Sequence, residues 1–525
     1  MEQKYVNEES VYKYDSNSIK KLFLNCEGII DNTNKSKYAQ FHTPWNIACF
    51  MAKMFNAPKC KTIRILEPGS GFGILTAAFI NNILLMNKDK IKKIIITMYE
   101  IDEKVIPKLA YNMNVISQIC NRKGLEIKYK IHNKDFISTF SSLEENNNYN
   151  YVIINPPYKK LKTKSEEKQI LKKLGLDSTN YYSAFVSLAK RVLIKNGELV
   201  AITPRSFCNG EYFNGFRKDL VHDMSFDKIH LFESRNEVFK NDEVLQESII
   251  YHCIKNKLNS KKKVQISYSY DESFNNIIKK QCKIDDIILP NDDKLIIRIL
   301  KHNEEDEISK KINLLDLTLD ELGISISTGP VVDFRELDKS LLKNYERRTM
   351  PIIFSEHISF NYIDWPKLNA KKYNYIMPND TNKNKLRNKG IYLLVKRITS
   401  KEDKRRIVSA ICNISGYNYI TFDNKVNYYH INKSGISYDI AKGLNIYLSS
   451  TIVDVYFRTL SGNTQVNASD LKSLKYPSEQ QILELAKHYS YVKGNQRRID
   501  NLINRILFND INDKGIIGSD IKEID

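Results

Sequence analysis

Four consecutive residues, Asn155-Pro156-Pro157-Tyr158, have side chains suited to chemistry, and they follow an apolar run over residues 151–154 that predicts a short strand. An amino group on an aromatic ring is a poor nucleophile, because the lone pair of its nitrogen is delocalised into the ring. If the Asn155 side-chain oxygen and a main-chain carbonyl of the proline turn each accept one amino hydrogen, the nitrogen approaches tetrahedral geometry. The motif could therefore prepare a planar amino group for methylation.

The other residues of this motif support the same interpretation. Pro156 and Pro157 each fix φ near about −65°, and neither has an N–H that would compete for the acceptors. Tyr158 offers a ring on which a base extruded from a duplex could stack, which offsets part of the cost of unstacking. Taken alone, the motif fits a strand that ends in a proline turn beside a structural tyrosine equally well. The rest of the sequence must decide.

A glycine-rich loop lies upstream, between a predicted strand over residues 62–66 and a predicted helix that begins at Ile74. The loop reads Glu67-Pro68-Gly69-Ser70-Gly71-Phe72-Gly73. Its glycines allow the backbone to come close to a ligand. Glu67 places a carboxylate at the end of the strand, where it would pair with a ligand ammonium and disfavour a pyrophosphate.

Two further predicted strands end in residues that suit a nucleoside. The strand over residues 93–99 is followed by Glu100 and Ile101, and a carboxylate at the end of the second strand suits the two hydroxyls of a ribose. The strand over residues 125–132 leads to Asp135 and Phe136. These two residues could contact the edge and the face of an adenine.

In this order, the motifs resemble those of the N6-adenine DNA methyltransferases of restriction-modification systems, in the arrangement called gamma class. Thr43 and Pro44, ahead of a predicted helix over residues 45–54, match the amino-terminal cofactor motif of that family. The resemblance implies that S-adenosylmethionine is the cofactor and that it contacts Thr43, Pro44, Glu67, Pro68, Gly69, Gly71, Glu100, Ile101, Asp135, Phe136 and Asn155. It also implies direct in-line transfer to a flipped adenine without a metal, by a site that contains Asn155, Pro156, Pro157, Tyr158 and, as a second stacking ring, Phe239.

The order of the motifs predicts the domain organisation. Cofactor motifs come first, the catalytic motif second and a long remainder last, as in the gamma class. We expect an N-terminal extension over residues 1–30, a Rossmann-like α/β domain dependent on S-adenosylmethionine over residues 31–280, and an α+β target-recognition domain over residues 281–525. The charged residues 159–179 predict a flexible segment that could close over substrate. Residues 477–508 predict one long helix or two.

A basic cluster in the last domain is the first candidate for DNA contact. Arginine can bind guanine through two hydrogen bonds, whereas lysine more often contacts phosphate. The alternative is a solvated charged face. The cluster comprises Lys396, Arg397, Lys404, Arg405 and Arg406.

Composition agrees with a nucleic-acid partner. The chain has 81 Lys and Arg against 62 Asp and Glu, a formal net charge of +19, which favours a polyanion through phosphate contacts, although a lysine-rich proteome would give the same surplus. The resemblance implies that this polyanion is double-stranded DNA. Its 525 residues fit two or three domains. Neither a run of about 20 apolar residues nor a signal peptide is visible, so a cytoplasmic protein without membrane contact is expected. Eight cysteines without a Cys-x-x-Cys pair indicate neither a zinc site nor a disulfide framework.

Several alternatives stay open. Enzymes that methylate cytosine at N4, the glutamine amide of release factors, or RNA face the same planar nitrogen and use similar motifs. Methylation at carbon 5 of cytosine is disfavoured, because no Pro-Cys dipeptide is present. A non-catalytic DNA-binding specificity protein is the alternative from another class. The DNA site, the oligomeric state (monomer or dimer) and a separate cognate endonuclease are not determined by the sequence.

Overall fold

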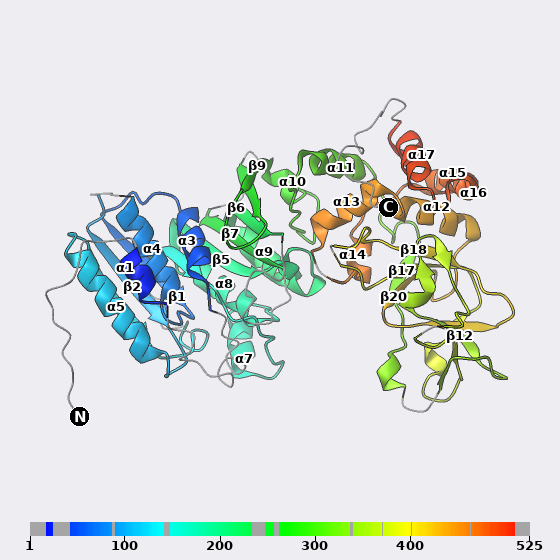
Figure 1. Cartoon of the computed structure of the whole chain (residues 1–525), viewed down its shortest axis with the longest axis horizontal. Coiled ribbons are helices and arrows are strands. Elements are labelled where there is room, and N and C mark those ends of the chain that lie inside the picture. Colours follow the sequence, from blue (N-terminus) through cyan, green and yellow to red (C-terminus); the bar gives the residue numbers. More distant parts are fainter. Residues whose placement is uncertain are drawn as a thin grey trace. The chain divides into compact units, whose positions relative to one another are not determined.

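The structure, a computed structural model, describes residues 17–24, 42–86, 90–140, 148–233, 247–256, 262–336, 340–369, 371–400, 402–462 and 464–509 (Figure 1). The chain forms two compact units. Unit 1 comprises Met1–Phe207 and Tyr212–Ile296, and unit 2 comprises Cys208–Glu211 and Ile297–Asp525. Phe239, the second stacking ring expected from the sequence, lies outside the described residues.

A nine-stranded sheet of order β3-β2-β1-β4-β5-β7-β6-β8-β9 runs through unit 1. Five adjacent strands run parallel to one another: β1 (Thr62–Pro68), β2 (Lys93–Tyr99), β3 (Glu126–His132), β4 (Tyr149–Ile154) and β5 (Leu193–Pro204). The sheet continues through β6 (Met224–Phe232), β7 (Ser248–Lys255), β8 (Lys263–Ser269) and β9 (Ile278–Lys283), with β7 antiparallel to both β5 and β6. Strand order reverses between β1 and β4, and open α/β sheets bind ligands at such a reversal, beyond the carboxyl ends of the strands.

Helices cover both faces of the parallel strands. On one face, Ile65 and Ile153 belong to a core cluster that also includes residues of α3 (Trp45–Met54), α4 (Ile74–Leu85) and α5 (Ile106–Asn121). Side chains alternate along a strand, so Val152 and Ile154 face the opposite side, where α8 (Tyr181–Arg191) contacts β1, β4 and β5. The continuous apolar run of β4 is typical of a parallel strand that is covered on both faces.

The predicted fold class is confirmed, because unit 1 is an α/β unit with a largely parallel sheet. The bounds of β2 and α3 coincide with those predicted. Residue 280 lies inside β9, an edge strand of the sheet, so unit 1 continues past that position to Ile296. Ile19, in the predicted N-terminal extension, is fully buried in the core of unit 1.

The segment over residues 159–179 contains a helix, contrary to the expectation of a flexible loop. The helix is α7 (Glu166–Lys173), and the Ser165 hydroxyl accepts a hydrogen bond from the Lys168 N–H at its start. Acidic residues occupy its first turn and lysines its last, which complements the helix dipole. Leu171 is the buried residue of this helix. High charge alone therefore did not indicate the absence of regular structure.

Unit 2 contains two larger sheets. A four-stranded sheet has the order β10-β20-β17-β18, formed by β10 (Ser325–Thr328), β20 (Val426–His430), β17 (Tyr392–Lys396) and β18 (Ser409–Cys412). A five-stranded sheet has the order β11-β15-β12-β19-β16, formed by β11 (Leu341–Leu342), β15 (Tyr375–Ile376), β12 (Met350–Ile353), β19 (Tyr419–Phe422) and β16 (Arg387–Asn388). Strands from both sheets share one core cluster, which includes Tyr392, Leu394, Phe422 and Tyr428.

Helices complete unit 2, which is therefore of the α+β type. The principal ones are α11 (Asn303–Asn313), α12 (Tyr438–Leu448), α13 (Thr451–Leu460), α15 (Glu479–Lys487) and α17 (Gln496–Phe508). The sequence predicted one or two helices over residues 477–508, and the structure has α15 and α17 with a short helix, α16 (Tyr489–Val492), between them. Across the described part of both units, no helix is long and apolar enough to cross a membrane.

The close approach of α12 and α15 gives a stability prediction. A Cβ atom on Gly443 would lie 2.0 Å from the Ile482 carbonyl oxygen, which is backbone and cannot rotate away. We expect Gly443→Ala to lower the free energy of unfolding by about 1–3 kcal/mol, because the two helices must separate. Chemical denaturation monitored by fluorescence would measure this. Gly215→Ala is the control, because its Cβ would meet its nearest atom at 3.5 Å; equal losses in both variants would contradict the packing argument.

Candidate active site

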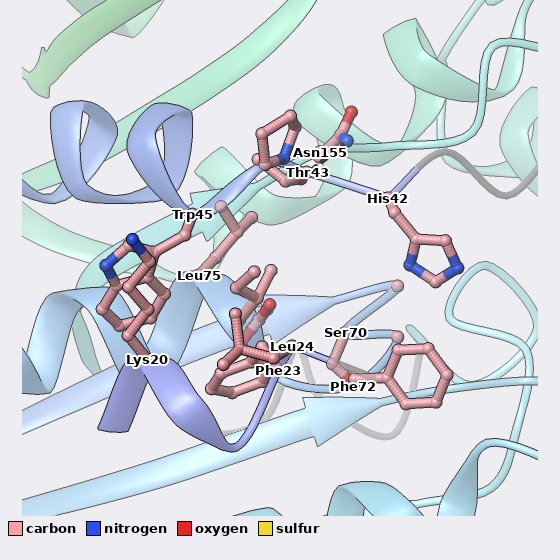
Figure 2. Close-up of a pocket in the computed structure, with 15 residues that line it drawn as sticks. Lys20, Phe23, Leu24, His42, Thr43, Trp45, Ser70, Phe72, Leu75 and Asn155 are labelled. Carbon is pink, nitrogen blue, oxygen red and sulfur yellow. Dashed lines mark hydrogen bonds between the residues drawn. The ribbon is translucent and has the colours of Figure 1, made fainter. Parts of the chain in front are cut away.

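A cavity of about 280 Å³ opens where the strand order reverses, beside the ends of β1 and β4 (Figure 2). Three segments and Asn155 form its wall: the end of α1 (Asn17–Lys21) with Phe23 and Leu24, residues 42–45, and the residues between 67 and 75 other than Pro68 and Gly73. The volume is near the lower limit for small-molecule sites. All the described residues that line it belong to unit 1.

The glycine-rich loop is bound to the end of β2 by its own backbone. The N–H groups of Gly69 and Ser70 both donate to the Tyr99 carbonyl at 2.9 Å, and the Gly71 N–H donates to Glu100 Oε2 at 2.7 Å. Gly69, Gly71 and Gly73 have φ values of 72°, 52° and 81°. L side chains rarely adopt these values, so this path of the chain requires glycine.

Glu67 is a buried carboxyl at the entrance to α4. Its Oε2 accepts hydrogen bonds from the Thr76 N–H, at 3.1 Å, and from the Thr76 hydroxyl. Burial raises the pKa of Glu67 to about 8, the Thr76 hydrogen bonds oppose this rise, and the nearby Glu100 carboxylate adds to it. Both Thr76 contacts involve Oε2, and the residue lines the cavity. A cation in the cavity would favour the ionised carboxylate.

Glu100 connects the glycine-rich loop to the residues after β2. Besides the Gly71 contact, its Oε1 accepts the Asp102 N–H at 2.8 Å, and its carbonyl accepts a hydrogen bond from Asn133 Nδ2 at 2.9 Å. Burial raises the pKa of this carboxyl, although both N–H contacts oppose the rise. The carboxylate is thus held by two backbone N–H groups, while the neighbouring Ile101 is exposed.

Asp135 and Phe136 follow β3 and form a structured turn. Asp135 Oδ1 accepts the Ser138 N–H at 2.8 Å, and burial raises the pKa of the carboxyl. The Phe136 ring is buried and lies 5.2 Å from the Phe185 ring. Neither residue lines the cavity, and the same holds for Glu100, Ile101 and the buried Pro68.

Asn155 meets the amino-terminal cofactor motif directly. Its Nδ2 donates a hydrogen bond of 2.9 Å to Thr43 Oγ1, and both residues line the cavity with Pro44 (Figure 2). This contact sets the rotation of the amide and directs Oδ1 away from Thr43. The structure thus brings together Asn155, Thr43, Pro44, Glu67, Gly69 and Gly71.

The Tyr158 ring is fixed by its neighbours. Its hydroxyl donates to the Ile202 carbonyl on β5 at 3.2 Å, and its ring packs edge-on against Tyr182 with centroids 6.3 Å apart. Burial raises the pKa of the phenol, so it stays a hydrogen-bond donor. The residue is half-buried, Pro157 is likewise half-buried, and Pro156 is buried. These contacts hold the Tyr158 side chain in one position.

Several cavity residues were not identified from the sequence. They include Lys20, Phe23, Leu24, His42, Trp45 and Phe72. The rings of His42 and Phe72 stack with centroids 5.2 Å apart. The helical spacing of Ile19, Leu22 and Phe23 was the available signal for α1.

The basic cluster of unit 2 is only partly exposed. Arg406 is fully buried, and its guanidinium lies over the Phe457 ring at 5.8 Å, so in this structure it supports α13 and cannot contact DNA. Arg397 donates to the Asn424 carbonyl at 3.0 Å and to Gln465 Oε1 at 3.1 Å. Arg405 and Lys396 are half-buried, and Lys404 is exposed.

Comparison with known proteins decides the family. The sequence model of the Eco57I restriction-modification methylase family matches residues 77–239. The chain is 40% identical over 488 residues to the Type II methyltransferase M.PstI of Providencia stuartii, a match that covers 91% of this chain and 94% of the relative. The chain belongs to the Type II DNA methyltransferases of restriction-modification systems.

Other members of this Type II methyltransferase family and several solved structures are also similar. M.BsuBI of Bacillus subtilis is 39% identical over 490 residues, which cover 91% of this chain and 95% of the relative. Among solved structures, that of a DrdV–DNA complex matches with a TM-score of 0.48 and 13% identity, over 91% of this chain and 59% of that one. The type IIG restriction endonuclease BpuSI matches with a TM-score of 0.45 and 13% identity, over 92% and 65%.

The pKa of Glu67 gives a prediction about this methyltransferase without ligand. The folded-state pKa is about 8, above the ordinary value of 4.5, so the folded protein retains a proton that the unfolded chain releases between these values. This contribution to stability is complete below about pH 4.5 and is lost as the pH rises through about 8. Glu67→Gln removes it. The wild type should therefore lose stability relative to the variant as the pH rises.

Denaturant titrations of both proteins at several pH values, without cofactor, would measure this difference. Thr76 can still donate to a glutamine carbonyl oxygen, so Glu67→Gln preserves the shape and the acceptor. A difference in unfolding free energy that does not change between about pH 5 and about pH 8.5 would mean that Glu67 is ionised normally in the fold.

Proposed function

We propose that this protein is a site-specific DNA methyltransferase that transfers a methyl group from S-adenosylmethionine to the N6 amino group of adenine in duplex DNA. The observation that carries the proposal is the hydrogen bond between Asn155 and Thr43 at the edge of the cavity. It joins the residue suited to holding an amino group to the motif suited to holding a cofactor. The two partners of a methyl transfer would therefore meet at one place.

The residues of the cavity fit S-adenosylmethionine. Glu67 is a buried carboxyl that a ligand ammonium would stabilise in its ionised form, and the positive-φ glycines leave three positions of the loop without a side chain. Thr43, Pro44, Gly69 and Gly71 would complete the wall around the ligand. We assign the ribose and the adenine of the cofactor to Glu100, Ile101, Asp135 and Phe136 beyond the next strand ends, with Pro68 supporting the loop. When bound, the cofactor supplies a methyl group on a positively charged sulfur, which is a good leaving group.

The chain's own residues would orient the target base. Asn155 Oδ1 and the Pro156 carbonyl accept the two amino hydrogens of a flipped adenine, which draws the lone pair back onto the nitrogen. Tyr158 presents its half-buried ring for stacking, and Pro157 fixes the turn between them. The Tyr158 hydroxyl is already bound to Ile202, so the ring is in place before the base arrives. Phe239 is proposed as the second stacking ring.

Unit 2 is proposed to recognise the DNA. Its size and its place after the catalytic motif agree with a target-recognition domain. Within the basic cluster, Lys404 is exposed, and Lys396, Arg397 and Arg405 are half-buried. Lys404 is therefore the first member to test for phosphate contact. A partner endonuclease would read the same DNA site.

Product analysis is the direct test of the reaction. The purified protein and an Asn155→Ala variant would be incubated with S-adenosylmethionine and duplex DNA of mixed sequence, and the digested nucleosides identified by mass spectrometry. We expect N6-methyladenine from the intact protein and a loss of about a hundredfold or more in the variant, because the amino group loses an acceptor. Cofactor affinity should change little. N4-methylcytosine would overturn the choice of base, and a parallel loss of cofactor binding would overturn the role of Asn155.

Thr43 gives a finer prediction about the orientation of the amide. Thr43→Val keeps the shape of the side chain but removes the oxygen that accepts from Asn155 Nδ2. We expect kcat to fall about tenfold, the size of one hydrogen bond, with little change in cofactor affinity. Thr43→Ser restores the acceptor and should recover most of the rate. Steady-state kinetics with calorimetric cofactor titrations would separate the two effects, and a loss confined to affinity would contradict the positioning role.

A further inference from the structure

A short N-terminal helix contributes to the wall of the cavity. Lys20 of α1 (Asn17–Lys21), with Phe23 and Leu24 just after the helix, lines the same cavity as Glu67 and Asn155 (Figure 2). These residues precede the amino-terminal cofactor motif, and none of the motifs identified in the sequence includes them. One side of the cavity is therefore formed by α1 and the residues just after it, in addition to the glycine-rich loop and the residues around Thr43.

Tertiary packing holds this helix in place. A helix of five residues is too short to be stable alone in water. Ile19 is fully buried in the core cluster of unit 1, and the Phe23 ring stacks on the Trp45 ring with centroids 5.9 Å apart and planes 22° apart. Phe23 also packs against a small core cluster formed by Val105 and by Phe72 of the glycine-rich loop. Because Trp45 and Phe72 line the cavity too, the position of α1 is coupled to the shape of the cavity.

Lys20 is chemically distinct among the residues of this wall. The described residues that line the cavity include one lysine, Lys20, and no arginine, while Glu67 is their acidic residue. Burial raises the pKa of the Cys49 thiol on α3, and the charges of Lys53 and Lys20 oppose this rise. The charge of Lys20 therefore acts on α3, the helix that begins at the cavity residue Trp45. Its neighbour Lys21 is exposed and does not line the cavity.

One carboxyl and one ammonium in a small cavity match a free α-amino acid group, which carries both charges in the opposite sense. We propose that α1 is part of the cofactor site and that Lys20 binds the carboxylate of the methionyl group, while Glu67 binds its ammonium. This inference rests on the proposed function, because it requires S-adenosylmethionine to occupy the cavity. It adds a residue of the N-terminal segment to the site and gives that segment a role in cofactor affinity.

The test compares two ligands that differ only in the carboxylate. Calorimetric titrations of the full chain, without DNA, would use S-adenosylmethionine and its decarboxylated form, which retains the ammonium and the sulfonium. For Lys20→Gln we expect affinity for S-adenosylmethionine to fall about tenfold or more, because a charge-assisted hydrogen bond is lost. Affinity for the decarboxylated ligand should stay within about twofold of the wild type. Lys20→Arg should retain most of the preference for the carboxylate.

Lys21→Gln is the matched control, because it removes the same charge from the next residue of the same helix. It should bind both ligands as the wild type does. Equal weakening of both ligands by Lys20→Gln would mean that Lys20 only supports the shape of the cavity, and unchanged binding would remove it from the site. Either result would overturn this inference and leave the proposed function intact. A wild-type protein that does not bind S-adenosylmethionine would instead contradict the proposed function itself.

Discussion

The hydrogen bond between Asn155 and Thr43 depends on where α3 lies, and α3 is held at both ends. At its start, the Pro44 carbonyl accepts a hydrogen bond from the Ala48 N–H, and Thr43 Oγ1 accepts one from Asn155 Nδ2, just after β4. Beyond its end, the Asn56 N–H donates to Glu198 Oε2 of β5 at 2.9 Å, and Lys228 Nζ of β6 donates to the Met54 carbonyl at 2.6 Å. Contacts from β5 and β6 therefore fix α3, and the residues at the start of α3 fix the side-chain amide of Asn155. The orientation of Asn155 that the proposed function requires therefore depends on the packing of α3 against the sheet.

Two buried carboxyls lie near each other: Glu67 lines the cavity, and Glu100, which is bound to Gly71 of the glycine-rich loop, has a charge that raises the pKa of Glu67. Burial disfavours the charge on each, and each backbone N–H that they accept restores part of the lost solvation. Without a ligand the balance leaves Glu67 with its raised pKa, because its hydrogen bonds from Thr76 do not compensate for full burial. A cationic ligand would lower the pKa of Glu67 and so favour its ionised form. The same acid that orders the start of α4 is thus suited to recognise an ammonium, so stability and binding share one side chain.

The sequence predicted what depends on local pattern. The strands before Glu67, Glu100 and Asn155 were identified because apolar runs end in polar residues, and parallel strands bring those ends to one edge. The sequence did not reveal that Glu100 would use its carboxylate to hold Gly71 and Asp102, since such contacts depend on how a loop folds back. It also could not place α1, because the burial of Ile19 and Phe23 depends on core residues far along the chain. Helix α7 was missed because its charge pattern, which supports a helix dipole, was interpreted as flexibility.

The basic cluster of unit 2 shows how charge counts overestimate DNA contact. Arg406 comes just before β18, and its backbone N–H donates to Asp454 Oδ1 of α13 at 2.7 Å. Asp454 also accepts from Arg458, so one buried carboxylate organises the approach of this loop to the helix. A guanidinium held over Phe457 in this interior has no path to a phosphate. A run of basic residues can therefore contain side chains with two different roles, and their burial distinguishes the structural ones from those that can reach DNA.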